Sequence, residues 1–258
     1  MNKNKVLIIM ICVLAVAIIA FVCDLPHINA ARLVEAIKAE DYDRVEKLLV
    51  SGIDPNVTTS SELTEVILNF VESTGERPLS VACKVGNLQI VKLLIDYGAT
   101  AEPHGTCGWS PLNQTLLHYQ PDDKEIVELL LSSGADIYED DGYGIPIFNA
   151  ASMLPKKYNG QDGNKANYID GYDADTASQI TDIVKLMLEY GNYDVNVRSP
   201  YQDTTLLITA VKCGNINLAE YLLSEGCDMS AVDITGKTAL DYAKSNDNTE
   251  MIAILKTG

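Results

Sequence analysis

The chain has 258 residues, of which 47% are apolar and 21% are charged, and this composition excludes both a wholly disordered chain and a collagen-like one. Its 36 acidic side chains outnumber the 19 basic ones, so the formal net charge is −17 at pH 7. A chain this acidic repels phosphate backbones, which makes nucleic acid a poor candidate partner, whereas a basic protein surface is attracted.

Residues 6–23 form an uninterrupted apolar run without charge, proline or glycine. A helix of this length spans about 27 Å, close to the hydrocarbon thickness of a bilayer. Two lysines precede the run and Asp24 follows it, so the positive-inside bias places the rest of the chain outside the cytoplasmic membrane. We therefore predict a membrane anchor within residues 1–30 and a separate domain over residues 31–258.

A cleaved signal peptide is the alternative interpretation of this N-terminal segment. Its apolar part is usually shorter, about 7–15 residues. However, Leu25 and Pro26 are suited to end the helix, and the sequence up to Ala30 is an acceptable cleavage site. In that case the domain over residues 31–258 is secreted or periplasmic, and in both cases it lies outside the cytoplasmic membrane.

One pattern recurs through residues 31–258: a small residue, a gap, two apolar pairs one helical turn apart, and a glycine. It runs with the same spacing from Ala82 to Gly98 and from Ala210 to Gly226. Four further copies begin at Ala36, Thr115, Ala150 and Ala243. The underlying period is about 33 residues, which is typical of a repeat protein.

Each repeat is predicted to form two short antiparallel helices. Prolines suit the first turn of the first helix, and glycines suit the left-handed position after the second. The predicted starts are Pro78, Pro111 and Pro146, and the predicted ends are Gly52, Gly98, Gly134, Gly191 and Gly226. Neither helix can bury its apolar stripe alone, so we expect an all-α solenoid of stacked helix pairs.

These motifs resemble the ankyrin repeat family over about residues 31–258. The family pattern G-x-T-P-L-H-x-A-A appears here as Gly75-Glu-Arg-Pro-Leu-Ser-Val-Ala82 and again as Gly236-Lys-Thr-Ala-Leu-Asp-Tyr-Ala243. The resemblance implies about six repeats joined by hairpin-like turns. The histidine of the family pattern is absent from every copy, which leaves the stiffness of the array open; its positions hold Ser80, Asn113, Phe148, Ile208 and Asp241.

Two insertions interrupt the repeats. In residues 58–74, apolar side chains fall on one helical face, which predicts a helix that packs on the array or binds a partner; they are Leu63, Val66, Ile67 and Phe70, and Thr59 is its expected N-cap. Residues 155–178 are rich in Gly, Asn, Asp and Tyr, so we expect a loop with little regular structure. Its acids leave a calcium site open, although no calcium-loop motif is present; they are Asp162, Asp170, Asp173 and Asp175.

The resemblance implies that turn tips and first helices bind a protein partner. Exposed aromatic side chains beside acids are the composition expected of an interface anchor with charge steering, although each can instead be a packed turn residue. The candidate contact residues are Trp109, Tyr138, Glu139, Asp140, Asp141, Tyr143, Tyr201, Tyr158, Tyr168 and Tyr172.

The sequence carries no phosphate-binding loop, nucleophile elbow or paired-histidine motif, so we expect neither an enzyme nor a cofactor. We expect a protein-interaction module displayed outside the cytoplasmic membrane, whose partner has a basic surface. One version is an inhibitor or immunity-type protein that masks its partner. Two alternatives stay open: a metal-dependent or enzymatic site in the insertion at 155–178, and a purely structural spacer of the envelope.

Overall fold

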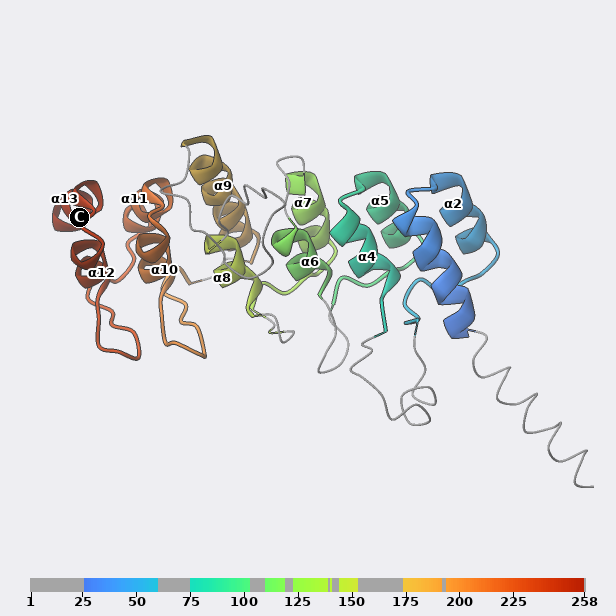
Figure 1. The fold of residues 1–258 in the computed structure, drawn as a ribbon, viewed down its shortest axis with the longest axis horizontal. Coiled ribbons are helices and arrows are strands. Elements are labelled where there is room, and N and C mark those ends of the chain that lie inside the picture. Colours follow the sequence, from blue (N-terminus) through green and yellow to red (C-terminus); the bar gives the residue numbers. More distant parts are fainter. Residues whose placement is uncertain are drawn as a thin grey trace, which may run out of the picture. The chain divides into compact units, whose positions relative to one another are not determined.

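The computed structural model describes residues 26–59, 75–102, 110–118, 123–138, 140, 144–152, 174–191 and 194–257. In these ranges the chain is helical, with turns between the helices and a single isolated β-bridge in one of them. The chain divides into two compact units, Met1–His118 and Tyr119–Gly258. Each unit is built from short helices arranged in two rows (Figure 1).

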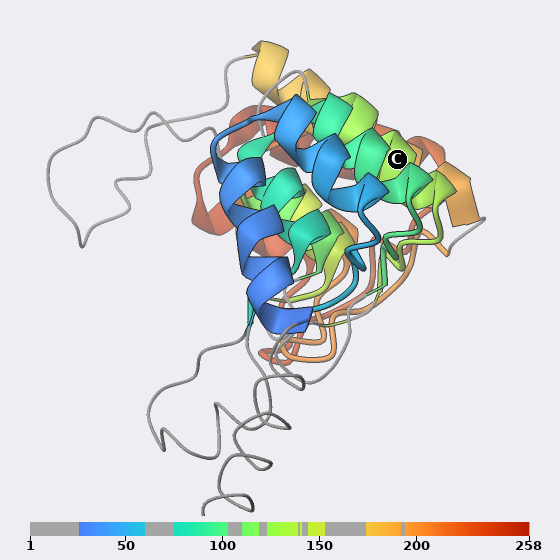
Figure 2. The same ribbon diagram turned by 90° about the vertical axis from the view of Figure 1, so that its right-hand side faces the viewer.

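The first unit contains a helix over residues 26–38 followed by four shorter ones. These are α2 (Tyr42–Val50), α4 (Pro78–Val85), α5 (Leu88–Asp96) and α6 (Pro111–Leu117). Helix α4 packs against α5, its partner in the repeat, and against α6, while α2 packs against α5. First helices therefore contact first helices and second helices contact second helices, as Figures 1 and 2 show from two sides.

The second unit repeats this arrangement. Its helices are α7 (Lys124–Ser132), α8 (Pro146–Ala151), α9 (Ala174–Gly191), α10 (Leu206–Cys213), α11 (Ile216–Ser224), α12 (Ala239–Ser245) and α13 (Thr249–Thr257). Helices α8, α10 and α12 form the first-helix row, and α7, α9, α11 and α13 form the second-helix row. Aliphatic side chains fill the space between the rows; Ile183, Leu207 and Leu222 are among those almost fully buried. The all-α solenoid expected from the sequence is confirmed.

The predicted starts of the first helices are confirmed. Pro78, Pro111 and Pro146 are the first residues of α4, α6 and α8, where the missing N–H is not needed. Helices α10 and α12 lack this proline and use a threonine cap instead. The side chains of Thr205 and Thr238 each accept an N–H from the third residue of the helix that follows.

The predicted ends of the second helices are confirmed at four of the five glycines. Gly52, Gly98, Gly134 and Gly226 all have φ between 77° and 92°, a conformation that glycine adopts without steric cost. At the fifth position the helix runs further than expected, because Gly191 is itself the last residue of α9.

Between the two helices of a repeat, the chain needs one further left-handed residue. Gly86 and Gly214 provide it after α4 and α10, with φ of 79° and 74°. Two other copies place a residue with a side chain there, Glu40 with φ of 53° and Asp247 with φ of 51°. Left-handed backbone is disfavoured for residues other than glycine, so these two turns hold local strain.

Side-chain amides tie consecutive repeats together where the family histidine is absent. In the first unit, Asn56 Nδ2 donates to Gly98 O (2.9 Å), and Asn56 Oδ1 accepts from the N–H of Thr100 (2.9 Å). In the second unit, Asn196 Oδ1 accepts from the N–H of Asp228 (2.7 Å). These bonds join the turn after one repeat to the turn after the next, so the missing histidine does not leave the turns unconnected.

The insertion at 58–74 lies largely outside the described residues, including the predicted helix with Leu63, Val66, Ile67 and Phe70. Its two ends are held together. Thr59 N–H donates to Glu76 O (3.1 Å), and Thr59 Oγ1 accepts from Glu76 N–H (2.9 Å). Thr59 was expected to cap the predicted helix; that helix lies outside the described residues, so the cap stays a prediction beside the bond from Glu76 N–H.

The insertion at 155–178 ends earlier than the sequence predicts. Residues 174–178, expected as part of a loop, form the first turn of α9. Ala174 and Ala177 favour helix, and Asp175 carries a negative charge in the first turn, where the helix dipole favours it. Residues 153–173 lie outside the described part of the chain.

The helix over residues 26–38 crosses the boundary at residue 30 that the sequence suggests. Ala30 is fully buried within it, and His27 Nδ1 lies 2.8 Å from Thr58 O. The apolar run at 6–23 lies outside the described residues. Among the helices that are described, none combines the length and apolar character needed to cross a bilayer.

Candidate functional site

Two hairpin loops precede the first helices α10 and α12 of the second unit. They cover residues 194–205 and 227–238 and extend away from both helix rows (Figure 1). The first loop closes through an antiparallel bridge between Arg198 and Thr205. A backbone hydrogen bond from Ile234 N–H to Gln202 O (3.0 Å) joins the tips of the two loops. The tips are therefore neighbours, connected by their own main chains.

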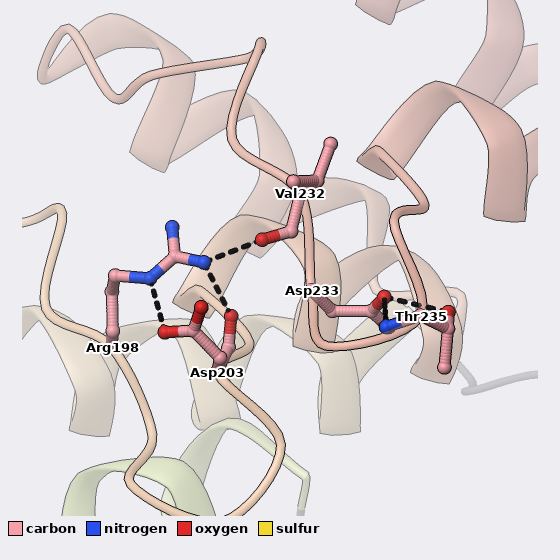
Figure 3. Close-up of polar contacts among 5 residues, drawn as sticks. All are labelled: Arg198, Asp203, Val232, Asp233 and Thr235. Carbon is pink, nitrogen blue, oxygen red and sulfur yellow. Dashed lines mark hydrogen bonds and ion pairs between the residues drawn. The ribbon is translucent and has the colours of Figure 1, made fainter.

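The Arg198 guanidinium links the same two loops through three acceptors (Figure 3). Its Nε donates to Asp203 Oδ1 (2.5 Å), and its Nη2 donates to Asp203 O (2.7 Å) and to Val232 O. The bond from Arg198 holds the pKa of the Asp203 carboxyl below its usual range. An arginine suits this position because its planar donors are fixed in direction and always charged.

Asp233 shapes the second loop from inside (Figure 3). Its Oδ1 accepts from Thr235 N–H (2.8 Å) and Thr235 Oγ1 (2.7 Å), as the figure shows. Oδ1 also accepts from Lys237 N–H (3.3 Å), and Oδ2 accepts from Tyr242 Oη (2.6 Å). These bonds hold the pKa of Asp233 far below its usual range, and the bond from Tyr242 contributes most. The carboxylate is buried, so it organises the loop rather than offering a charge to solvent.

Three apolar side chains project from these loops into solvent, and we call Tyr201, Val232 and Ile234 the tip patch. Their exposed fractions are 64%, 41% and 71%. A single exposed apolar residue is ordinary on a protein surface, but here three come from loops that are cross-linked at the backbone. Exposed aromatic and aliphatic side chains on a fixed backbone of this kind are typical anchors of protein interfaces.

Beside the tip patch, two lysines lie around one aromatic ring, and we call Lys212, Lys237 and Tyr242 the lysine–tyrosine cluster. The Nζ atoms of Lys212 and Lys237 are 4.8 Å and 5.3 Å from the centroid of the Tyr242 ring. Lys212 Nζ also donates to Gln202 Oε1 (3.4 Å), which connects the cluster to the loop that carries Tyr201. In the part of the chain described by the structure, neither lysine belongs to an ion pair.

The structure places few of the contact residues predicted from the sequence. Tyr201 is strongly exposed and belongs to the tip patch. Tyr138 is half-buried and Asp140 is exposed, both on the turn before α8. The remaining candidates lie outside the described residues, and their role stays a prediction: Trp109, Glu139, Asp141, Tyr143, Tyr158, Tyr168 and Tyr172.

Sequence reasoning missed most of the residues that build this site. Asp233-Ile-Thr-Gly-Lys237 is a turn sequence in which the aspartate accepts from the backbone two residues on, so the fixed loop could have been anticipated. The bond from Arg198 to Val232 could not, because it joins residues far apart in sequence.

No group of three or more potential metal-ligating side chains occurs within the described ranges. Asp175, one of the four acids that left a calcium site open, lies in the first turn of α9. The other three, Asp162, Asp170 and Asp173, lie outside those ranges, so the calcium hypothesis is not tested.

Comparison with known proteins agrees with this architecture. A family model described as ankyrin repeats, in three copies, matches residues 33–141 and 175–258. The chain belongs to the ankyrin repeat family. The unmatched residues between these two ranges cover most of the insertion predicted at 155–178. Proteins of this repeat family are generally interaction modules without catalysis.

Three similar proteins illustrate the relationship. The human palmitoyltransferase ZDHHC13 is 27% identical over 252 residues, which cover 90% of this chain and 37% of the relative. EF0377, an ankyrin repeat protein of known structure, is 25% identical with a TM-score of 0.62, covering 88% of this chain and 98% of the other. A chain in the complex of the Bd0816 predatory endopeptidase from Bdellovibrio bacteriovorus with the immunity protein Bd3460 is 23% identical, also with a TM-score of 0.62, covering 87% of this chain and 96% of that one. The chain spans 10% to 45% of the curated relatives that it matches.

Proposed function

We propose that this chain is a non-catalytic module that binds a protein partner through its turn tips and first helices. The tip patch is the observation that carries the proposal. Tyr201, Val232 and Ile234 are exposed, yet they stand on loops fixed by the Arg198 and Asp233 hydrogen bonds. Loops that are already fixed lose little backbone entropy when a partner binds, so more of the contact energy remains as affinity.

The net charge gives the overall character of the partner. A formal charge of −17 produces a negative field that accelerates encounter with a basic protein and repels nucleic acid. Exposed aspartates at the turns after the second helices contribute to this field: Asp54, Asp136, Asp194 and Asp228. We therefore propose a partner that is basic overall, whose association slows as salt screens the field.

An inhibitor or immunity-type role is the specific version that we favour. Ankyrin repeats act by occupying a partner's surface, and masking an enzyme or a toxin requires no chemistry. The complex of an endopeptidase with an immunity protein contains a chain of this fold, which makes occupancy of a hydrolase a concrete possibility to test. We further propose six repeats, because the helix starts and ends follow the predicted period from the helix over residues 26–38 to α13.

We propose that residues 6–23 anchor the chain in the cytoplasmic membrane, with the repeats outside. Cleavage near Ala30 would remove the first turn of the helix over residues 26–38, including His27 and its contact to Thr58. Ala30 itself is fully buried, which favours an uncleaved anchor over a secreted form. Mass spectrometry of the mature protein tests this: a first peptide that starts after residue 30 would exclude the anchor.

Partner capture tests the binding role. The full chain, tagged and kept in mild detergent, is used to capture proteins from membrane extract at low and at high salt. We expect one dominant partner that is lost with Tyr201→Ala/Ile234→Ala. The matched control, Val50→Ala/Tyr97→Ala, also removes an exposed aliphatic and an exposed tyrosine but in the first unit, and should retain the partner. Equal retention by both variants would contradict a role for the tip patch.

A further inference from the structure

The lysine–tyrosine cluster retains unused capacity to bind an anion. An ammonium group has three donors, and Lys212 uses one on Gln202 Oε1 while no hydrogen bond is found for the Lys237 side chain in the described residues. Both ammonium groups also lie over the Tyr242 ring, a cation–π contact that does not use up their N–H donors. An incoming carboxylate therefore adds charge-assisted hydrogen bonds that these lysines lack among the described residues.

Three acids on the two loops and on α12 already have hydrogen-bond partners. All four hydrogen bonds described above converge on Asp233, and Asp203 is paired with Arg198. Asp241 Oδ2 accepts from both the N–H and the hydroxyl of Thr238 (3.0 and 2.8 Å). These hydrogen bonds from Thr238 are the main cause that lowers the pKa of Asp241, and the nearby charges of Lys244 and Lys237 lower it further. Lys237 forms no ion pair with Asp241.

A second lysine–tyrosine contact in the same unit differs from this cluster, because its lysine also pairs with a carboxylate. Lys185 Nζ of α9 lies 5.6 Å from the centroid of the Tyr221 ring, and it also pairs with Glu189 Oε1 (3.9 Å). The second-helix row that carries this pair has more acids than bases: Glu125, Glu128, Asp175, Asp182, Glu189, Glu220 and Glu250, against Lys124, Lys185 and Lys256. The charged side chains of the first-helix row are Lys212, Asp241 and Lys244.

We propose that the lysine–tyrosine cluster receives an acidic side chain of the protein partner, whose neighbouring apolar side chain packs on Ile234 and Tyr201. Gln202 connects the two halves of this surface, since its side chain contacts Lys212 and its carbonyl accepts from Ile234 N–H. The partner segment is thus acidic and apolar in alternation, although the partner as a whole is basic. The acids of the second-helix row of this unit repel the same segment, which disfavours its binding to that row.

This inference rests on the proposed function and refines it, so its test is separate. Random peptides displayed on phage are selected against the full chain in mild detergent, and affinities of the selected peptides are measured by fluorescence anisotropy. We expect peptides with Asp or Glu beside an aliphatic residue. Lys212→Gln/Lys237→Gln should weaken their binding at least tenfold, and Lys212→Arg/Lys237→Arg should restore most of it. Lys185→Gln, the matched control, should leave it within twofold.

A double-mutant cycle separates a direct contact from a general charge effect. Replacing the peptide's acidic residue by its amide should weaken binding to the wild-type chain but not to Lys212→Gln/Lys237→Gln. Selected peptides without acids, or equal losses on both proteins, would overturn the inference. If the captured partner is lost with Tyr201→Ala/Ile234→Ala but kept by Lys212→Gln/Lys237→Gln, the inference fails and the proposed function stands. Failure of both selection and capture would count against both.

Discussion

Replacing Leu222 with alanine tests the assignment of the buried stripe of α11. Leu222 is fully buried, on a helix that packs against α9, α10 and α13. Loss of its buried side-chain carbons costs about 2–3 kcal/mol by transfer from water, and an incompletely relaxed cavity adds about 1–2 kcal/mol. We expect the free energy of unfolding to fall by about 3–5 kcal/mol, measured for the full chain by urea titration followed by far-UV circular dichroism.

The next residue of the same helix provides the control. Leu223 is chemically identical but partly exposed, so Leu223→Ala should cost only about 1 kcal/mol. Leu130 of α7 is also fully buried, so Leu130→Ala should lower the free energy of unfolding in the same way. Repeat proteins can unfold in parts, so the transition of the C-terminal repeats must be followed separately if two appear. An unchanged urea midpoint for Leu222→Ala, or a larger loss for Leu223→Ala, would refute the register of the repeats.

Three further outcomes are expected. Asp233→Asn should destabilise the chain at pH 7; because the folded pKa of Asp233 is depressed, the stability gap to wild type should narrow as pH falls below about 5, and a gap independent of pH would contradict this. Glu40→Gly should be more stable than Glu40→Ala by about 0.5–1 kcal/mol in thermal unfolding, because both variants lose the bond from Asn87 Nδ2 to Glu40 Oε2 (3.0 Å) and only glycine relieves the left-handed strain; equal stability would contradict this. Burial raises the pKa of the Cys227 thiol to about 11, so alkylation of this residue at pH 8 should be on the order of a hundredfold slower than for a free cysteine and should rise steeply toward pH 11; comparable rates at pH 8 would argue against it.

Local chemistry explains why much of the fold follows from the sequence. Proline at the start of a helix and glycine after its end impose backbone conformations within a few residues, so Pro78, Pro111 and Gly98 were placed correctly without tertiary information. The spacing of the apolar pairs within each second helix likewise predicts which side chains are buried, and Ile126 and Leu130 are both buried as expected.

Interactions between distant residues explain most of what the sequence could not predict. The bond from Glu76 N–H to the Thr59 hydroxyl joins residues on the two sides of an insertion, and only the folded chain brings Glu76 near. Lys212 and Tyr242 belong to different repeats, and nothing in their spacing indicates that one lies over the ring of the other. At Glu40, propensity was overridden, because the turn between two packed helices needs a left-handed residue whatever its side chain.

The pairing of Thr59 with Glu76 means that the two ends of the segment between them lie within hydrogen-bonding distance of each other. A segment whose ends are already clamped adds little closure entropy as it lengthens, because that cost grows only with the logarithm of its length. The segment between Thr59 and Glu76 is therefore a suitable insertion site. Replacing it with a fluorescent reporter or a foreign epitope should leave the flanking helices intact.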